Sequence, residues 1–329
     1  MTVFNSNISR EDASALIPED ASKEILQTIA EGSSVLRLSR RLPNMARGQR
    51  RLPVLSALPQ AYFVGEAGRS PQTFTEVKQT TEAAWANKYL NAEEIACVVP
   101  IPENVLEDAD FDIWGEMRPQ IVASIGAVID TAILFGTSDV DVPRNWPDGL
   151  LVAMPAAHIV SETFGNDLYD AIMGEGGVLS YVEEDGYLVN GHLSALTMRS
   201  KLRGLRDGGT GLPLFVQNMQ NAVPYTLDGQ RLEFPLNGAM DDSQALLVSG
   251  DFNQLVYSIR KDITYKVLTE GVITDNATPR AIIHNLGQDD MIALRVTFRM
   301  AWQLPNPINR VNQTEATRFP FAALAPSGS

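Results

Sequence analysis

The stretch from Phe111 to Gly136, FDIWGEMRPQIVASIGAVIDTAILFG, constrains the fold more than any other part of this chain. Apolar residues recur in it at steps of three and four, so they share one stripe of a helix: Trp114, Met117, Ile121, Ile125, Val128 and Ala132. Further apolar residues widen the stripe, so little of the helix can face water. A helix of about 24 residues is roughly 36 Å long, about the width of a small domain. We therefore predict a strut that crosses the molecule.

Pro119 is the exception in this pattern. A proline inside a helix removes one backbone hydrogen bond and costs about 3 kcal/mol or more. We therefore expect a kink at Pro119 or a helix that starts close to it. Asp110 or Asp112 can cap the start of the helix, and Gly136 lies where it should end.

Composition excludes several classes of protein. A chain of 329 residues, 44% hydrophobic and 20% charged, is long enough for one large or two ordinary globular domains. Its net charge of -14 argues against tight binding of nucleic acid. The one cysteine, Cys97, excludes an internal disulfide and is expected in the core. Because the start is not a signal peptide and no apolar run reaches about 18 residues, we expect folding in a cytoplasm and no membrane partner.

An arginine-rich segment follows a short predicted helix that begins at Ala15. Six arginines fall within fifteen residues: Arg37, Arg40, Arg41, Arg47, Arg50 and Arg51. One interpretation is an arm that binds a polyanion. The other, which the negative net charge favours, is an extended segment that pairs with acidic surface on its own chain or on a neighbouring copy.

Residues 52–100 predict a long hairpin, with two β-rich arms around a middle rich in proline and glycine. Apolar residues such as Phe74 and Val77 cannot find a core within so narrow a ribbon. An isolated two-stranded ribbon is only marginally stable. If nothing in its own fold supports the hairpin, another subunit must do so.

The rest of the chain predicts a mixture of helices and strands. Helices are expected at Asp167–Val182, interrupted by Gly174, Gly176 and Gly177, and at 192–207. Strands are expected at 150–152, 186–191, 212–217, 225–234 with a turn at 227–230, 245–260, 263–273, 289–305 and 319–324. The strand at 289–305 has the strongest pattern, because β-branched and aromatic residues fill most of it.

Little in the sequence is typical of catalysis or metal binding. His158, His192 and His284 are far apart and are expected at the surface or as caps. No nucleophile elbow, phosphate-binding loop or dinucleotide fingerprint is present. The acidic run formed by Glu103, Glu107, Asp108, Asp110 and Asp112 lacks the register of a calcium loop and predicts a solvated or intersubunit face. We predict no enzyme, no cofactor and no metal; an enzyme with a site between the two middle helices is the remote alternative.

The order of these elements resembles the major capsid proteins of tailed bacteriophages, which have the Hong Kong 97 fold. The resemblance extends from Ala15 to Leu324 and is carried by LIPEDASKEILQTIAEGSSVLRLSRRLP, AYFVGEAGRSP with Glu66, VPIPENVLEDADFDI, SGDFNQLVYSIRKDITYKV and DDMIALRVTFRMAWQLPNP. It implies an α+β fold with an N-terminal arm (1–51), an extended hairpin loop (52–100), a peripheral domain with a long spine helix (101–149), an axial domain (150–249), peripheral return strands (250–305) and a C-terminal segment that rejoins the axial domain (306–329).

The resemblance also implies a function. Such a subunit assembles with itself into hexamers and pentamers of an icosahedral shell around double-stranded DNA, and it lies in the virion after assembly in the host cytoplasm. An encapsulin, a bacterial compartment shell of the same fold, stays the alternative. Further implied partners are a portal and a decoration protein. Only about fourteen residues precede the arm, so scaffolding is expected from a separate protein, or else the numbering begins after removal of a scaffolding segment. No sequence-specific binding of nucleic acid is implied. Candidate contacts between copies are the six arginines, Glu66, Glu107, Asp108 and Asp110.

Some members of this family form Lys–Asn cross-links between subunits. The hairpin carries Lys78 and Lys88, and the late region carries Asn306, Asn309 and Asn312. Nothing in the sequence pairs any of them, so we expect a single monomer band from assembled particles on a denaturing gel.

Overall fold

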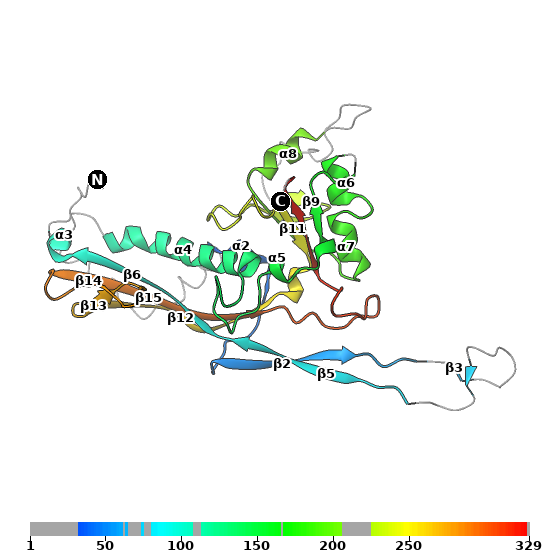
Figure 1. The fold of residues 1–329 in the computed structure, drawn as a ribbon, viewed down its shortest axis with the longest axis horizontal. Helices are drawn as coiled ribbons and strands as arrows, with labels where there is room; N and C mark the ends of the chain where they lie inside the picture. Colours follow the sequence, from blue (N-terminus) through cyan, green and yellow to red (C-terminus); the bar gives the residue numbers. More distant parts are fainter. Residues whose placement is uncertain are drawn as a thin grey trace.

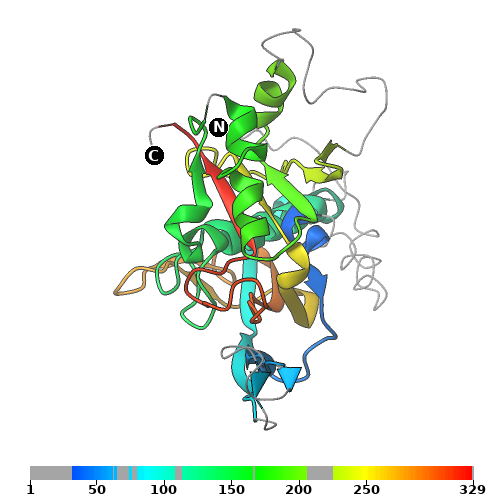
Figure 2. The ribbon, with the colours of Figure 1, turned by 90° about the vertical axis from the view of Figure 1, so that its right-hand side faces the viewer.

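The computed structural model describes residues 32–61, 63–64, 74–75, 80–107, 113–165, 167–205 and 225–327. The predicted helix from Ala15 and the predicted strand at 212–217 lie outside these residues. The described part has an α+β fold, with a four-stranded sheet under a long helix and a six-stranded sheet beside them (Figure 1). A narrow ribbon projects past both sheets (Figures 1 and 2).

The four-stranded sheet has the order β1-β12-β15-β6. Its strands are β1 (Arg40–Arg41), β12 (Val256–Leu268), β15 (Met291–Gln303) and β6 (Glu93–Pro102). β15 is antiparallel to both β12 and β6. Alternate side chains of β15 enter the main core: Leu294, Val296, Phe298, Met300 and Trp302. The strongest strand prediction is therefore confirmed, because its period of two matches a sheet with one buried face.

The long helix α4 (Ile113–Phe135) covers the buried face of this sheet. It runs through Pro119, so the expected start near this proline is wrong. Pro119 is exposed, and the helix is held by its later turns, where Ile125, Ile129 and Ile133 are at most 2% exposed. Val128, placed on the apolar stripe by the sequence, is instead 50% exposed.

α4 also corrects the membrane analysis. Its residues Met117–Phe135 are long and apolar enough to cross a membrane, although 56% of the window is buried within the protein. Burial against the sheet accounts for this composition, because the core helix of a folded domain meets the same criteria.

The six-stranded sheet has the order β7-β16-β11-β8-β10-β9. These strands are β7 (Ile159–Ser161), β16 (Phe321–Ala325), β11 (Leu247–Gly250), β8 (Gly191–Ser194), β10 (Gln230–Glu233) and β9 (Thr226–Leu227). Helices α6 (Leu168–Met173), α7 (Val178–Glu184) and α8 (Met198–Gly204) pack beside it, and Gly174, Gly176 and Gly177 separate the first two as expected. All five residues of β16 are buried, which confirms the last predicted strand.

Some short elements differ from the prediction, because short apolar runs do not distinguish helix from strand. Residues Leu150–Ala153 form the helix α5 and not a strand. Leu188 is 81% exposed, and the strand expected at 186–191 begins only at Gly191. The helix expected at 192–207 is therefore strand β8 first and helix α8 only from Met198.

The strand expected at 245–260 is broken in two. β11 ends at Gly250, where a Cβ atom would lie 2.3 Å from the Pro320 carbonyl oxygen, so the β16 backbone approaches too closely for a side chain. Asp251 then caps the short 3-10 helix η2 (Phe252–Gln254), and β12 continues into the other sheet.

Other short elements are α3 (Glu103–Glu107), η1 (Ala156–His158), β13 (Val272–Thr274) and β14 (Ile282–Asn285), with β3 (Phe63–Val64) and β4 (Phe74–Thr75) toward the tip of the ribbon.

Candidate assembly surfaces

The ribbon is made by β2 (Gln49–Ala57) and β5 (Ala84–Asn91), which pair antiparallel from Gln49↔Asn91 to Ala57↔Ala84. Most of its residues are exposed or half-buried, and only Val54 and Leu90 are buried. It therefore does not bury itself within its own molecule. Its second arm is shorter than the predicted hairpin, because Glu93–Pro102 belongs to the four-stranded sheet as β6.

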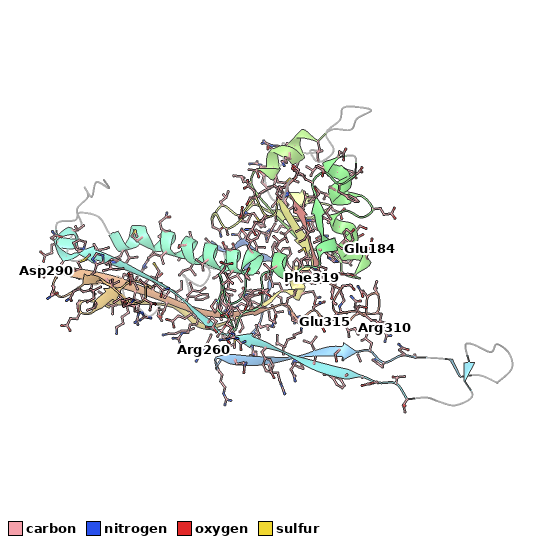
Figure 3. All side chains as sticks on the ribbon, viewed as in Figure 1. Glu184, Arg260, Asp290, Arg310, Glu315 and Phe319 are labelled. Atoms are coloured by element: carbon pink, nitrogen blue, oxygen red, sulfur yellow. The ribbon has the colours of Figure 1, made fainter. Side chains whose placement is uncertain are left out.

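β2 and β5 are fixed to the body by the segment that precedes β16. The Lys88 ammonium lies 2.9 Å from a Glu315 carboxylate oxygen, and this contact lowers the pKa of Glu315. The Ile308 amide donates to the Leu55 carbonyl at 3.3 Å. Arg310, seen with Glu315 beside the ribbon in Figure 3, donates to Pro59 at 3.0 Å. The ribbon is thus anchored along much of β2 and β5, from Lys88 to Pro59.

One face of the ribbon carries exposed aromatic side chains. Trp85 and Tyr89 are 67% and 44% exposed, and they share a face because alternate residues of a strand do. Arg51 lies opposite Tyr89 and is also exposed. Trp, Tyr and Arg are the residue types enriched where protein interfaces derive most of their energy. This face, which we call the aromatic face, is the first candidate assembly surface.

The arginines follow only in part the expectation that they pair with acidic surface of their own chain. Arg37 lies 3.4 Å from Glu233 and forms an ion pair. Arg41 and Arg50 donate to neutral oxygens of Asn44 and Pro43, at 3.2 and 2.7 Å.

The other three arginines of the run are exposed, and no ion pair to their side chains is found within the described residues: Arg40, Arg47 and Arg51. They are the second candidate surface. Of the acidic candidates, Glu107 is exposed at the end of α3, whereas Glu66, Asp108 and Asp110 lie outside the described residues.

Two histidines are buried, and the expectation of surface or capping positions is wrong for them. His192 is 0% exposed, with Nδ1 2.8 Å from Ser249 Oγ and Nε2 3.0 Å from the Leu227 carbonyl oxygen. Burial lowers its pKa to about 4. His158 lies between the Phe321 carbonyl oxygen, 3.0 Å from Nδ1, and Asp185, 3.3 Å from Nε2. Both rings join distant segments of the six-stranded sheet and its helices.

The residues considered for a cross-link are engaged within the chain, as far as the structure describes them. Asn306 accepts from Tyr187 and Arg318, and Asn312 donates to Asp185. Asn309 donates to the Asp185 carbonyl oxygen at 2.6 Å. Lys78 lies outside the described residues. These asparagines organise the segment before β16.

Clusters of side chains that could catalyse a reaction or bind a metal ion are scarce in the part of the chain that the structure describes. No group of three or more His, Cys, Asp or Glu residues there could hold a metal ion. Cys97, expected in the core, is half-buried on β6. An open cleft of about 480 Å³ lies between α4 and β6, lined by apolar residues such as Val128 and Trp146 with Glu93 and Asp141. It holds no pairing of a nucleophile with a base.

Comparison with known proteins decides the family. The model of the phage capsid family matches residues 13–308. This chain belongs to the phage capsid family. It is 24% identical over 301 residues to the major capsid protein of Staphylococcus phage 80alpha. The match covers 91% of this chain and 85% of that protein.

Solved structures agree with the family assignment. A chain from Microbacterium phage Oxtober96 is 33% identical with a TM-score of 0.75, and it covers 98% of this chain and 100% of its own. A chain from Mycobacterium phage Bobi is 31% identical with a TM-score of 0.73 and the same coverage. These matches confirm the Hong Kong 97 type of fold and favour a phage capsid protein over an encapsulin.

Proposed function

We propose that this capsid family member is the major capsid protein of a tailed phage and forms the hexamers and pentamers of an icosahedral shell around double-stranded DNA. The observation that carries the proposal is a family match over nine tenths of the chain together with a ribbon that its own fold leaves exposed. A net charge of -14 suits a container that does not adhere to densely packed DNA.

The fold supports a division of roles. The ribbon and the arm up to Arg51 act as straps between copies, the six-stranded sheet region is the axial domain, and α4 with the four-stranded sheet is the peripheral domain. Many modest contacts add up, because each strap acts at high effective concentration once its neighbour is bound. The shell lies in the virion after assembly in the host cytoplasm, with portal, scaffolding and decoration proteins as further partners. The role is structural, and it needs no cofactor.

Electron microscopy and sedimentation of the expressed full chain test the proposal. Closed shells or ring-shaped capsomers are expected. A monodisperse monomer at high protein concentration, with and without a co-expressed scaffolding protein, would contradict it. Encapsulated enzyme cargo in place of DNA would favour the compartment alternative.

A further inference from the structure

β6 forms one edge of the four-stranded sheet, and its open side can be identified from a hydrogen bond at its end. The Glu103 amide donates to the Asp290 carbonyl at 2.8 Å, and the ladder from Met291↔Pro102 to Met300↔Glu93 has no register shift. In an antiparallel ladder, hydrogen-bonded and non-bonded pairs alternate. Odd-numbered residues of β6 therefore bond to β15, and the backbone groups of the even-numbered residues point away from the sheet.

The positions of the prolines support this assignment. Pro100 and Pro102 are both even-numbered, and proline is accepted in an edge strand where its nitrogen faces away from the ladder. The N–H and C=O groups of Glu94, Ala96 and Val98 consequently form a short open edge. Within the described residues, no strand pairs with this side of β6.

The ribbon shows that the same side of the chain accepts a strand. β2 pairs with β5, and the Ala92 amide donates to the Gly48 carbonyl at 2.8 Å, so even-numbered residues of β5 bond toward β2. The opposite side of β5 faces the body, since Gln303 donates to the Tyr89 carbonyl. β2 therefore occupies the same edge that β6 leaves open, and this pairing ends at the bond between Gly48 and Ala92, two residues before Glu94.

The other edge of the sheet is protected along β12, whereas β6 is blocked only by Pro100 and Pro102 and stays open at Glu94–Val98. β12 has two register irregularities and carries Arg260 and Lys261 there, and the segment before β2 covers its start through the Met45 amide bond to Ile259. Bulges, basic residues and covering segments are the devices that keep sheet edges from pairing. On β6, in contrast, Ala96 and Val98 are small, apolar and exposed, with Val98 40% exposed.

We propose that a strand from a second copy of this chain pairs with the open edge of β6 at Glu94–Val98, in line with β2. A second copy is the occupant because the proposed function is a shell built from copies of this chain, and because the edge continues the exposed ribbon. The Glu94 carboxylate is already paired with Arg299, so the approaching strand meets no uncompensated charge there. Pro100 and Pro102 limit the pairing to this short stretch. The inference rests on the proposed shell function.

Hydrogen exchange resolved to single residues tests the inference on free subunits and on assembled shells. In free subunits the amides of Glu94, Ala96 and Val98 should exchange faster than those of Ile95, Cys97 and Val99. In shells the first three should slow by roughly tenfold or more, the factor that corresponds to about 1.4 kcal/mol. Shells in which the three amides still exchange as in the free subunit would overturn the inference, and so would three amides already protected before assembly.

Ala96→Pro gives a second test, because the amide it removes is not used within the chain. The subunit should keep its melting temperature within a few degrees, while the yield of shells should fall by about tenfold or more. Ala96→Val is the matched control, since it keeps the amide and should assemble. Normal shells from folded Ala96→Pro would contradict the inference alone, whereas wild-type chain that forms no shells would contradict the proposed function. If Ala96→Pro does not fold, the exchange measurement decides.

Discussion

At the scale of residues, the position of the arm depends on one buried carboxylate. Asp130 is 0% exposed on α4, and it accepts hydrogen bonds from Ser33 Oγ, from the Ser34 and Val35 amides at 3.0 and 3.3 Å, and from Asn237 Nδ2 at 2.8 Å. Burial raises its pKa, and these donors oppose the rise. Asp130 thereby caps helix α2 (Ser34–Leu38), the helix that leads into the arginine-rich segment, from a different helix.

Asp130→Ala should therefore destabilise the unassembled subunit by about 3 kcal/mol, because it leaves several buried donors without an acceptor. Urea unfolding of the subunit measures this loss. Asp242→Ala, at an exposed turn, is the control and should change stability by less than about 0.5 kcal/mol. Equal stability of Asp130→Ala and wild type would show that α2 does not depend on this cap.

His192 predicts a dependence of stability on pH. Its pKa in the fold, about 4, lies below the ordinary value of 6.5, so the unfolded chain takes up a proton that the folded chain does not. The stability from neutral His192 is therefore present above pH 6.5 and is lost as the pH falls toward 4. Between about pH 7 and about pH 5 the loss should be about 2 kcal/mol.

His192→Gln should remove this part of the acid-induced loss, measured as the difference in unfolding free energy from wild type at the two pH values. His284→Gln is the control, because His284 is half-exposed on β14 and keeps contact with water when the chain folds. Identical pH dependence of His192→Gln and wild type would contradict the assignment.

At the scale of elements, local patterns predicted the parts whose burial follows a single period. α4 and β15 each turn an apolar face to one core, so periodicity was sufficient to predict both elements, although Val128 of the predicted stripe is exposed. β8 was missed because His192 and Ser194 are polar residues buried by partners far along the chain, Ser249 and the Leu246 carbonyl. The burial of Asp130 could not be predicted for the same reason, because its partners Ser33 and Asn237 are about a hundred residues away in the sequence.

The candidate surfaces were predicted only in outline. The sequence showed that the ribbon needs support, but not that Trp85 and Tyr89 are exposed, since that depends on which face of β5 packs against the body. It likewise showed an arginine-rich segment, but not that Arg37 pairs with Glu233 while Arg40 does not.

The contact of α4 with Gly32 and Ser33, the two residues just before α2, allows a prediction at this scale. At Gly126, a Cβ atom would lie 2.8 Å from the Gly32 carbonyl oxygen, so the backbones touch without a side chain between them. Alanine in a helix normally gains about 0.5–1 kcal/mol over glycine. In Gly126→Ala the clash with backbone atoms should outweigh this gain and give a net loss of about 1–2 kcal/mol in thermal or urea unfolding.

Gly204→Ala is the matched control, because it makes the same change in α8 where no atom lies within 4 Å of the added Cβ. It should leave stability unchanged or raise it by up to about 1 kcal/mol. A Gly126→Ala variant as stable as Gly204→Ala would mean that the backbone at Gly32 and Ser33 can move away from α4 at little cost.

At the scale of the whole molecule, the residues that stabilise the fold differ from the residues that we expect to contact neighbouring copies. Two large apolar clusters hold the sheets and helices together, and they do not include Trp85 or Tyr89. Only the small cluster of Met45, Leu90 and Ala301 lies at the base of the ribbon. Changes on the aromatic face should therefore affect assembly without affecting folding.

Trp85→Ala tests this separation. Because the side chain is 67% exposed in the single chain, its removal should change the unfolding free energy of the subunit by less than about 0.5 kcal/mol. Within a shell the same side chain would be covered by a neighbour, and the loss of a central aromatic contact is of the order of 2 kcal/mol or more. The concentration of free subunit that coexists with shells, measured by sedimentation, should then rise by about tenfold or more. Trp85→Phe keeps an aromatic ring at the contact and should assemble close to the wild-type concentration. If Trp85→Ala assembles as readily as Trp85→Phe, the aromatic face is exposed to solvent in the shell. The ribbon would then contact its neighbour through its strand edges.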